Sequence, residues 1–262
     1  MDHKEVGEYW NNNALAWTTI ARAGFDIYRD YLNTPAFFGM LPSVEGLQGI
    51  DIGCGEGYNT RLLSERGAVM TAIDISKVFI EKAKEAEAQH LLGIHYKVAS
   101  AVELPFAENQ FDFATSFMCL MDIPELEQAL AEAYRVIKPG GFFQFSITHP
   151  CFDTPVRKNK KDLQGRTYAI EVGNYFKPIH GLVEEWIFGA APAHLKSAFP
   201  KFQTPKFSRT LSQWANALIQ CGFVLEQFNE PYPSDEVVQQ QPRLQDAQQV
   251  AYFLQVRCRK PF

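Results

Sequence analysis

Apolar and polar residues along this chain of 262 residues follow the rhythm of an α/β protein. Short apolar runs, which predict buried strands, alternate with stretches whose apolar residues recur at helical spacing. The predicted strands are 49–52, 69–73, 94–98, 111–116, 142–148, 223–229 and 250–258. The predicted helices are 58–66, 77–89, 125–137 and one from a Thr210–Gln213 capping box to Gly222. Because single helices joining strands force right-handed crossovers, we predict a doubly wound, mostly parallel seven-stranded sheet.

Three stretches depart from this rhythm. Residues 8–41 place aromatic side chains at helical spacing, which predicts one or two amphipathic helices with breaks at Pro35 and Pro42. From Pro150 to Phe207, prolines interrupt any period, and we expect a lid over a site. The glutamine-rich segment 239–249 predicts a mobile loop. The expected units are a helical cap (1–44), a core (45–149), a lid insertion (150–207) and a completion of the core sheet (208–262).

Composition narrows the class of protein. The net charge is −5, and the one basic cluster, Arg157 to Lys161, is short, which argues against a nucleic acid substrate. No apolar run approaches the roughly 20 residues of a membrane span, and no secretory or transit signal opens the chain. Five scattered cysteines favour reduced thiols and a cytoplasmic location. His180 and Glu184 lack a third ligand, so we expect no metal site.

The first predicted strand ends in three alternating glycines, Gly53, Gly55 and Gly57, and a helix begins at once at Tyr58. Only glycine allows so tight a turn with no Cβ between the backbone and a ligand. The free N–H groups at the start of the helix can then donate to a polar ligand.

Two acidic residues accompany this turn. Asp51 precedes the glycines, and Asp74 closes the next apolar run, 21 residues after Gly53. In a doubly wound sheet that second position lies beside the first turn, where a carboxylate can accept both hydroxyls of a ribose. The alternative is that Asp74 caps the following helix, a role that Ser76 could also fill.

Two further phrases, Leu-Pro-Phe at 104–106 and Lys-Pro-Gly-Gly at 138–141, follow in order. With them the chain resembles the class I S-adenosylmethionine-dependent methyltransferases over roughly residues 45–150. It is most similar to the small-molecule group typified by ubiquinone and menaquinone biosynthesis, methyltransferase type 11. The resemblance implies S-adenosylmethionine as cofactor, S-adenosylhomocysteine as product, and methyl transfer to an oxygen, nitrogen or carbon of a small-molecule acceptor.

The resemblance also implies which residues bind the cofactor. Ile75 would lie against the adenine face, and Phe117 and Met118 follow a strand at the ligand-binding edge. Members of the family often have an aspartate near Ser100 and Ala101, so this chain departs from the pattern at the adenine contact. The expected cofactor residues are Asp51, Gly53, Gly55, Gly57, Asp74, Ile75, Ser100, Ala101, Phe117 and Met118.

The acceptor side is less specific. Aromatic side chains could wall an acceptor pocket or fill an ordinary core, and the candidates are Tyr9, Trp10, Trp17, Tyr28, Tyr175 and Trp186. His149 ends the fifth strand and is the candidate general base, unless it only bonds to the lid. Arg209 and Glu230 could line the pocket or form a structural pair.

Three other functions remain open. A nicotinamide-dependent reductase would use G-x-G-x-x-G and a Tyr-x-x-x-Lys pair, and neither occurs near the expected cleft. A non-catalytic protein that binds S-adenosylmethionine would carry the same motifs. A nucleic acid methyltransferase is disfavoured by the acidic charge balance. A homodimer is a further expectation on assembly.

Overall fold

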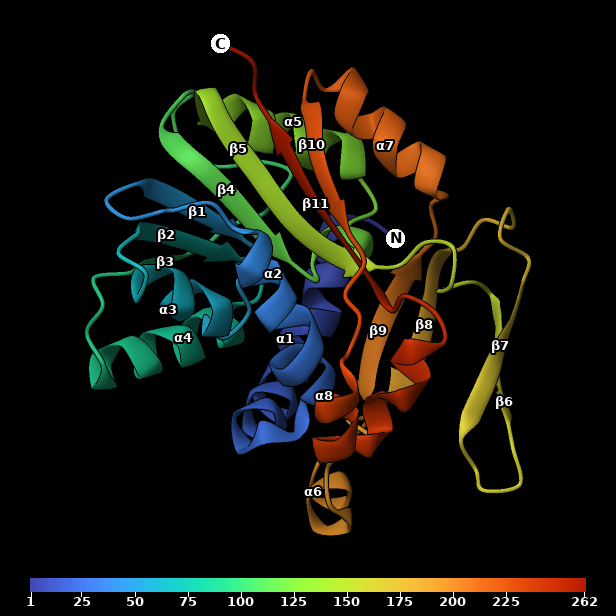
Figure 1. Ribbon diagram of the computed structural model, residues 1–262. Coiled ribbons are helices and arrows are strands. Elements are labelled where there is room, and N and C mark those ends of the chain that lie inside the picture. Colours follow the sequence, from blue (N-terminus) through green and yellow to red (C-terminus); the bar gives the residue numbers. More distant parts are fainter.

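The computed structural model describes residues 1–262, which form a central seven-stranded sheet in the order β10–β11–β5–β4–β1–β2–β3 (Figure 1). β11 alone runs antiparallel to the other six strands, so the doubly wound, mostly parallel sheet is confirmed. The strands are β1 (Gln48–Ile52), β2 (Val69–Asp74), β3 (His95–Val98), β4 (Phe111–Phe117), β5 (Ile137–Thr148), β10 (Val224–Asn229) and β11 (Phe253–Arg259).

Helices cover both faces of the sheet, as the alternating strand and helix patterns predict (Figure 1). On one face, Leu130 of α5 (Leu126–Val136) and Trp214 of α7 (Leu211–Gln220) pack in one core with Phe145. On the other face, Leu63 of α3 (Tyr58–Ser64) and Ile80 of α4 (Lys77–Gln89) share a core with Phe113. The binding edge is therefore built on strands that are buried on both faces.

The N-terminal residues form α1 (His3–Ile20), two short π-helical turns and α2 (Thr34–Met40). Pro35 lies in the first turn of α2, where its missing N–H is harmless, so the predicted break there is a helix start. Asn11 and Asn13 fasten α1 to two distant segments. The Asn11 Oδ1 accepts from the Val78 backbone N–H (3.2 Å), and the Asn13 amide bonds both backbone groups of Gln203 (2.9 and 3.0 Å).

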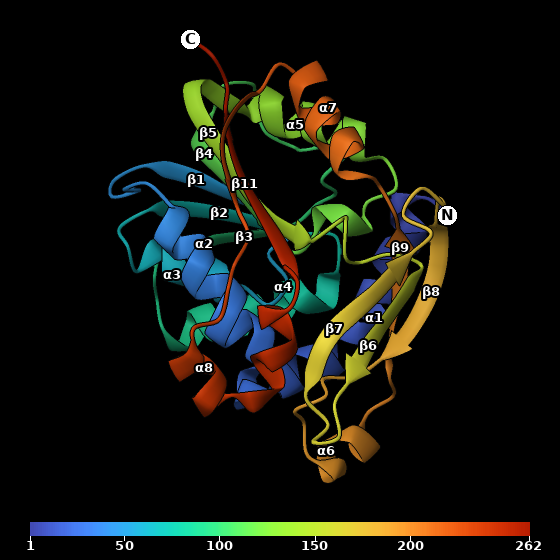
Figure 2. The same ribbon diagram turned by 45° about the vertical axis from the view of Figure 1, so that its right-hand side comes forward.

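Residues 150–207 contain two β-hairpins that the sequence did not predict. One joins β6 (Val156–Lys161) to β7 (Thr167–Gly173); the other joins β8 (His180–Trp186) to β9 (Phe202–Phe207), with α6 (Ala193–Ala198) between its strands. Figure 2 shows both hairpins beyond the main sheet, and β9 of the second hairpin packs against α1. Most positions of β6 and β7 are exposed or only partly buried, so their strands lack the apolar alternation that identifies a half-buried strand.

The prediction of a mobile loop at 239–249 is wrong. This segment contains the end of α8 (Asp235–Gln240) and a 3₁₀-helix over Pro242–Gln248. Asp246 anchors it, because its carboxylate accepts hydrogen bonds from the hydroxyls of Tyr28 (2.7 Å) and Tyr252 (2.5 Å). Across the whole chain, no helix has both the length and the apolar character to cross a membrane.

Candidate functional site

A cavity of about 1090 Å³ opens at the carboxyl edge of the parallel strands. Ligand pockets usually have volumes of roughly 300–1,000 Å³, so this space suits a cofactor together with a second small molecule. Its walls come from residues 3–33, from the strand ends between 51 and 148, from 153–207 and from 242–253. Residues 3–33 and 153–207 thus enclose one cavity together with the strand ends.

The three glycines of the first turn all have left-handed φ angles: +76° at Gly53, +54° at Gly55 and +83° at Gly57. A Cβ on Gly53 would lie 2.1 Å from the Cys119 sulfur, and one on Gly57 would lie 2.5 Å from the Tyr96 hydroxyl. A Cβ on Gly55 would meet no atom within 4 Å, and Gly55 lines the cavity. The outer two glycines are therefore required by packing, and the middle one leaves room for a ligand.

Asp51 stabilises the glycine turn from the end of β1. Its buried carboxylate accepts hydrogen bonds from the hydroxyls of Thr60 on α3 (2.6 Å) and Thr115 on β4 (2.9 Å). Burial raises the pKa of Asp51 to about 6, and the two hydroxyls oppose that shift. Asp51 thereby ties together the strand before the turn, the helix after it and the neighbouring strand.

Asp74 lies at the end of β2, buried beside the turn. Its carboxylate accepts from the backbone N–H groups of Gly55 and Ser76, both at 2.8 Å. Desolvation raises the pKa of Asp74 to about 6. The cap of α4 is Ser76, whose hydroxyl accepts from the Phe79 N–H at 3.2 Å, so capping is not the role of Asp74. Its carboxylate lines the cavity and can accept from a ligand.

Nine of the ten predicted cofactor residues line this cavity; only Gly57 does not. The Ser100 hydroxyl accepts from the Val102 N–H at 3.3 Å within its own turn. Met118 adopts a left-handed φ of +55°, and its N–H donates to the Ser146 carbonyl at 2.8 Å. Such strain in a residue other than glycine is concentrated at functional edges of folds.

Four of the six predicted aromatic wall residues line the cavity: Trp10, Trp17, Tyr28 and Trp186. Tyr9 and Tyr175 lie outside it, which corrects the prediction for both. The Tyr175 hydroxyl accepts from the Leu211 N–H at 2.7 Å, so it fastens the lid to the first turn of α7. A sequence pattern cannot separate these two roles, because it does not give the direction in which a loop aromatic points.

The prediction that His149 opens onto the cleft is wrong. His149 is buried outside the large cavity, with its Nε2 2.7 Å from the Glu230 carboxylate and its Nδ1 accepting from the Cys151 N–H at 3.2 Å. Burial lowers the pKa of His149, and Glu230 opposes the shift. The histidine holds the start of the lid against the end of β10, the structural alternative that the sequence left open. Arg209 and Glu230 also lie outside the cavity.

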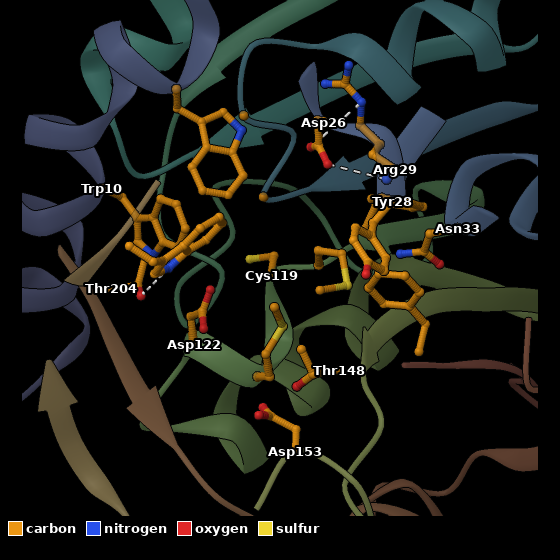
Figure 3. Close-up of a pocket in the computed structure, with 18 of the residues that line it drawn as sticks. Trp10, Asp26, Tyr28, Arg29, Asn33, Cys119, Asp122, Thr148, Asp153 and Thr204 are labelled. Carbon is orange, nitrogen blue, oxygen red and sulfur yellow. Dashed lines mark hydrogen bonds and ion pairs between the residues drawn. The ribbon is translucent and has the colours of Figure 1, made fainter. Parts of the chain in front are cut away.

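Several polar residues that the sequence did not single out line the cavity (Figure 3). Asp122 follows β4 at the same edge as Met118, a position that could have identified it. Asp153 pairs with Lys206 at 2.7 Å across two lid segments, which no local pattern shows. The Asn33 Oδ1 accepts from Ser146 (2.8 Å) and Gln255 (2.9 Å), so its unpartnered Nδ2 is oriented toward the cavity.

A methyltransferase domain model matches residues 50–145. The chain is 36% identical over 108 residues to a malonyl-[acyl-carrier protein] O-methyltransferase of Serratia marcescens, which is 41% of each protein. It is 31% identical over 110 residues to a ubiquinone biosynthesis O-methyltransferase of Coxiella burnetii, 42% of this chain and 47% of the relative. The chain thus spans less than half the length of these two curated relatives.

One solved structure resembles nearly the whole chain. It is an S-adenosylmethionine-dependent methyltransferase from Mesorhizobium loti, with a TM-score of 0.69 and 28% identity. The likeness covers 86% of this chain and 96% of that one, so it includes segments outside residues 50–145.

Two alanine substitutions separate packing from ligand contact in the glycine turn. Gly53→Ala should lower the free energy of unfolding by about 2–4 kcal/mol, because it adds a clash with Cys119 to left-handed strain. Gly55→Ala carries only the strain, about 1–2 kcal/mol, but its methyl group enters the cavity. Denaturant unfolding of both variants measures the difference. Equal destabilisation would contradict the proposed division of roles.

His149→Ala tests the corrected role of the histidine. The variant should lose about 1–3 kcal/mol of stability, because it leaves Glu230 and the Cys151 N–H without their partner. The affinity for a ligand in the large cavity should change less than about twofold, since His149 does not line it. Calorimetry with S-adenosylhomocysteine and denaturant unfolding give the two readouts. Unchanged stability with strongly reduced affinity would return His149 to the site.

Proposed function

We propose that the chain is a class I S-adenosylmethionine-dependent methyltransferase, which transfers the methyl group of S-adenosylmethionine to a small-molecule acceptor. One observation carries the proposal. The open face of Gly55 and the buried carboxylate of Asp74 meet at one end of a cavity that is large enough for two ligands. A close backbone approach and a fixed carboxylate are what a nucleoside-bearing ligand requires at this edge.

In the proposed complex, Asp74 accepts hydrogen bonds from the two ribose hydroxyls. Ile75, Ser100 and Ala101 surround the adenine, because they line the cavity next to Asp74. The glycine turn, together with Phe117 and Met118, contacts the methionine part, with Asp51 supporting the turn from beneath. Gly57 contributes through the backbone geometry of the turn and not through contact.

The bound cofactor supplies an electrophilic methyl group, so the protein has to align the acceptor and exclude water. Correct alignment alone is worth about 7–11 kcal/mol of a reaction barrier. The aromatic residues of α1 and the lid, which include Trp17 and Trp186, provide an apolar wall for this purpose. We propose that residues 150–207 act as the lid of this cavity.

Several features support the finer parts of the proposal. The net charge of −5 favours a small molecule over nucleic acid as the acceptor. All five cysteines are free thiols, which supports a cytoplasmic location. The homodimer remains a prediction, and size-exclusion chromatography with light scattering would measure the oligomeric state. The relatives are named for oxygen acceptors, but the residues 50–145 that match the domain model include none of the cap or lid residues that would touch an acceptor.

Ligand binding tests the proposal directly. S-adenosylhomocysteine should bind to the wild-type protein, and NAD should not, because the G-x-G-x-G turn and Asp74 suit a single nucleoside. Calorimetry with both ligands measures the preference. Labelled S-adenosylmethionine incubated with a cell extract then separates an enzyme from a non-catalytic binder, which would bind the cofactor and transfer no label. Binding of NAD alone would overturn the proposal in favour of a reductase.

Asp74 should make cofactor affinity depend on pH. Its carboxyl has a pKa of about 6, so it becomes protonated as the pH falls from 7 to 5 and no longer accepts from both hydroxyls. The dissociation constant of S-adenosylhomocysteine should therefore rise by roughly 3–10-fold over that range. Asp74→Asn should weaken binding at pH 7 by about 1–3 kcal/mol and flatten the profile. Any pH dependence of affinity that the Asp74→Asn variant keeps is assigned to Asp26 and Asp51, because burial raises the pKa of each to about 6.

A further inference from the structure

One part of the cavity has chemistry that the cofactor does not explain. We call this part of the cavity the acceptor chamber. It is lined by three tryptophans, three carboxylates and the lysine that pairs with two of them: Trp10, Trp17, Trp186, Asp122, Asp153, Glu184 and Lys206. Only Asp122 of these residues falls within the segment 50–145 that matches the methyltransferase domain. The acceptor chamber is therefore built mostly from this chain's cap and lid, and the core contributes Asp122.

Three indole rings form one side of the acceptor chamber. The ring centroids of Trp10 and Trp17 are 5.4 Å apart, those of Trp17 and Trp186 are 5.3 Å apart, and both pairs meet edge to face. The Trp186 Nε1 donates to the Thr204 hydroxyl at 2.9 Å, which fixes that ring (Figure 3). Indole faces attract cations more strongly than any other side-chain ring.

The other side of the acceptor chamber is acidic, and one carboxylate has no partner. Lys206 is shared between Asp153 at 2.7 Å and Glu184 at 3.5 Å. The Asp122 side chain forms no hydrogen bond or ion pair with the protein. Arg209 attracts it only from outside the cavity, where its guanidinium donates to the carbonyls of Ile123 and Pro124. In Figure 3 the Asp122 carboxylate points toward the side of the cavity that holds Trp10.

Asp122 is partly buried and lines the cavity, so its unpartnered carboxylate is accessible to a ligand that carries a hydrogen-bond donor or a positive charge. Burial and the neighbouring Asp153 raise the pKa of Asp122 well above its usual range, while Lys206 and Arg209 oppose the shift. A carboxylate-bearing acceptor would face three carboxylates and one shared ammonium. A cationic group would favour the charged form of Asp122, and it would lie between that carboxylate and the indole rings.

We propose that the acceptor is an amine on an aromatic or apolar small molecule, and that Asp122 holds its nitrogen in the acceptor chamber. This inference rests on the proposed methyltransferase function and names the acceptor class of that same site. It differs from the acceptors in the names of the two curated relatives, which are O-methyltransferases. Asp122 is thereby assigned as a catalytic residue.

The proton and electron balance of the step is simple. The bound ammonium passes one proton to the Asp122 carboxylate, which leaves the nitrogen lone pair free. That pair forms the N–CH₃ bond while the C–S bond breaks, so the positive charge moves from sulfur to nitrogen and S-adenosylhomocysteine is released. The methylated ammonium leaves as a cation, and the Asp122 carboxyl returns its proton to solvent. A raised pKa of the carboxyl makes the first transfer easier.

Three matched probes test the acceptor class: tryptamine, tryptophol and indole-3-acetic acid, which share one ring system and differ in the terminal group. Their dissociation constants are measured by calorimetry on protein saturated with S-adenosylhomocysteine. We expect tryptamine to bind at least tenfold more tightly than tryptophol, and indole-3-acetic acid to bind most weakly. Asp122→Asn should remove most of the tryptamine preference, whereas Asp162→Asn, on the exposed β6–β7 turn outside the cavity, should keep it.

Each result has a defined meaning. Equal binding of the three probes, tighter binding of the alcohol or the acid, or no binding of tryptamine at millimolar concentration would overturn the amine assignment. The Asp122→Asn variant can also overturn it. If this variant keeps the tryptamine preference and loses affinity for S-adenosylmethionine but not for S-adenosylhomocysteine, the carboxylate binds the sulfonium and not the acceptor. If the wild-type protein does not bind S-adenosylhomocysteine at all, the proposed function itself fails. Circular dichroism and unfolding of each variant confirm that it is folded.

Discussion

The contact between the bare backbone of Gly53 and the side chain of Cys119 is the constraint on which the site depends. A Cβ at Gly53 would lie 2.1 Å from the Cys119 sulfur, so the turn after β1 and the loop after β4 fit only without one. These two segments carry the two ends of the cavity. Gly55 and Asp74 lie on the side of the first turn, and Asp122 lies three residues beyond Cys119. This close packing contact thus helps to fix Gly55 and Asp74 relative to Asp122.

The cavity is lined by carboxylates whose charged forms work against stability. Burial raises the pKa of Asp26, Asp51 and Asp74 to about 6 in the folded chain, against an ordinary value of 3.8. Such a group takes up a proton on folding, so the stability it contributes is fully present below pH 3.8 and is lost as the pH rises through 6. At neutral pH these carboxylates are ionised, and their desolvation lowers the free energy of unfolding. Hydrogen bonds from Thr60 and Thr115 offset part of this loss at Asp51.

Sequence reasoning succeeded where the structure is set by local patterns. The seven strands and the glycine turn follow from apolar runs and from φ requirements that are visible in a few residues. It failed where a side chain's direction depends on distant contacts. His149 ends its strand as expected, but Glu230 holds it away from the cavity. The helical turns around Asp246 depend on hydroxyls from Tyr28 and Tyr252, which local composition cannot show.

The two halves of the cavity therefore differ in how the chain encodes them. The cofactor half is built by consecutive strands and turns, so one continuous segment, 50–145, contains most of its chemistry. The acceptor half is assembled from α1, β8, β9 and the loop after β4 that carries Asp122. Paired amide contacts of Asn13 with Gln203 hold α1 and β9 together. A change in α1 or the hairpins can alter the acceptor wall without disturbing Asp51 or Asp74. In the proposed enzyme, acceptor choice is therefore a property of long-range packing, and a match to the core alone does not transfer it.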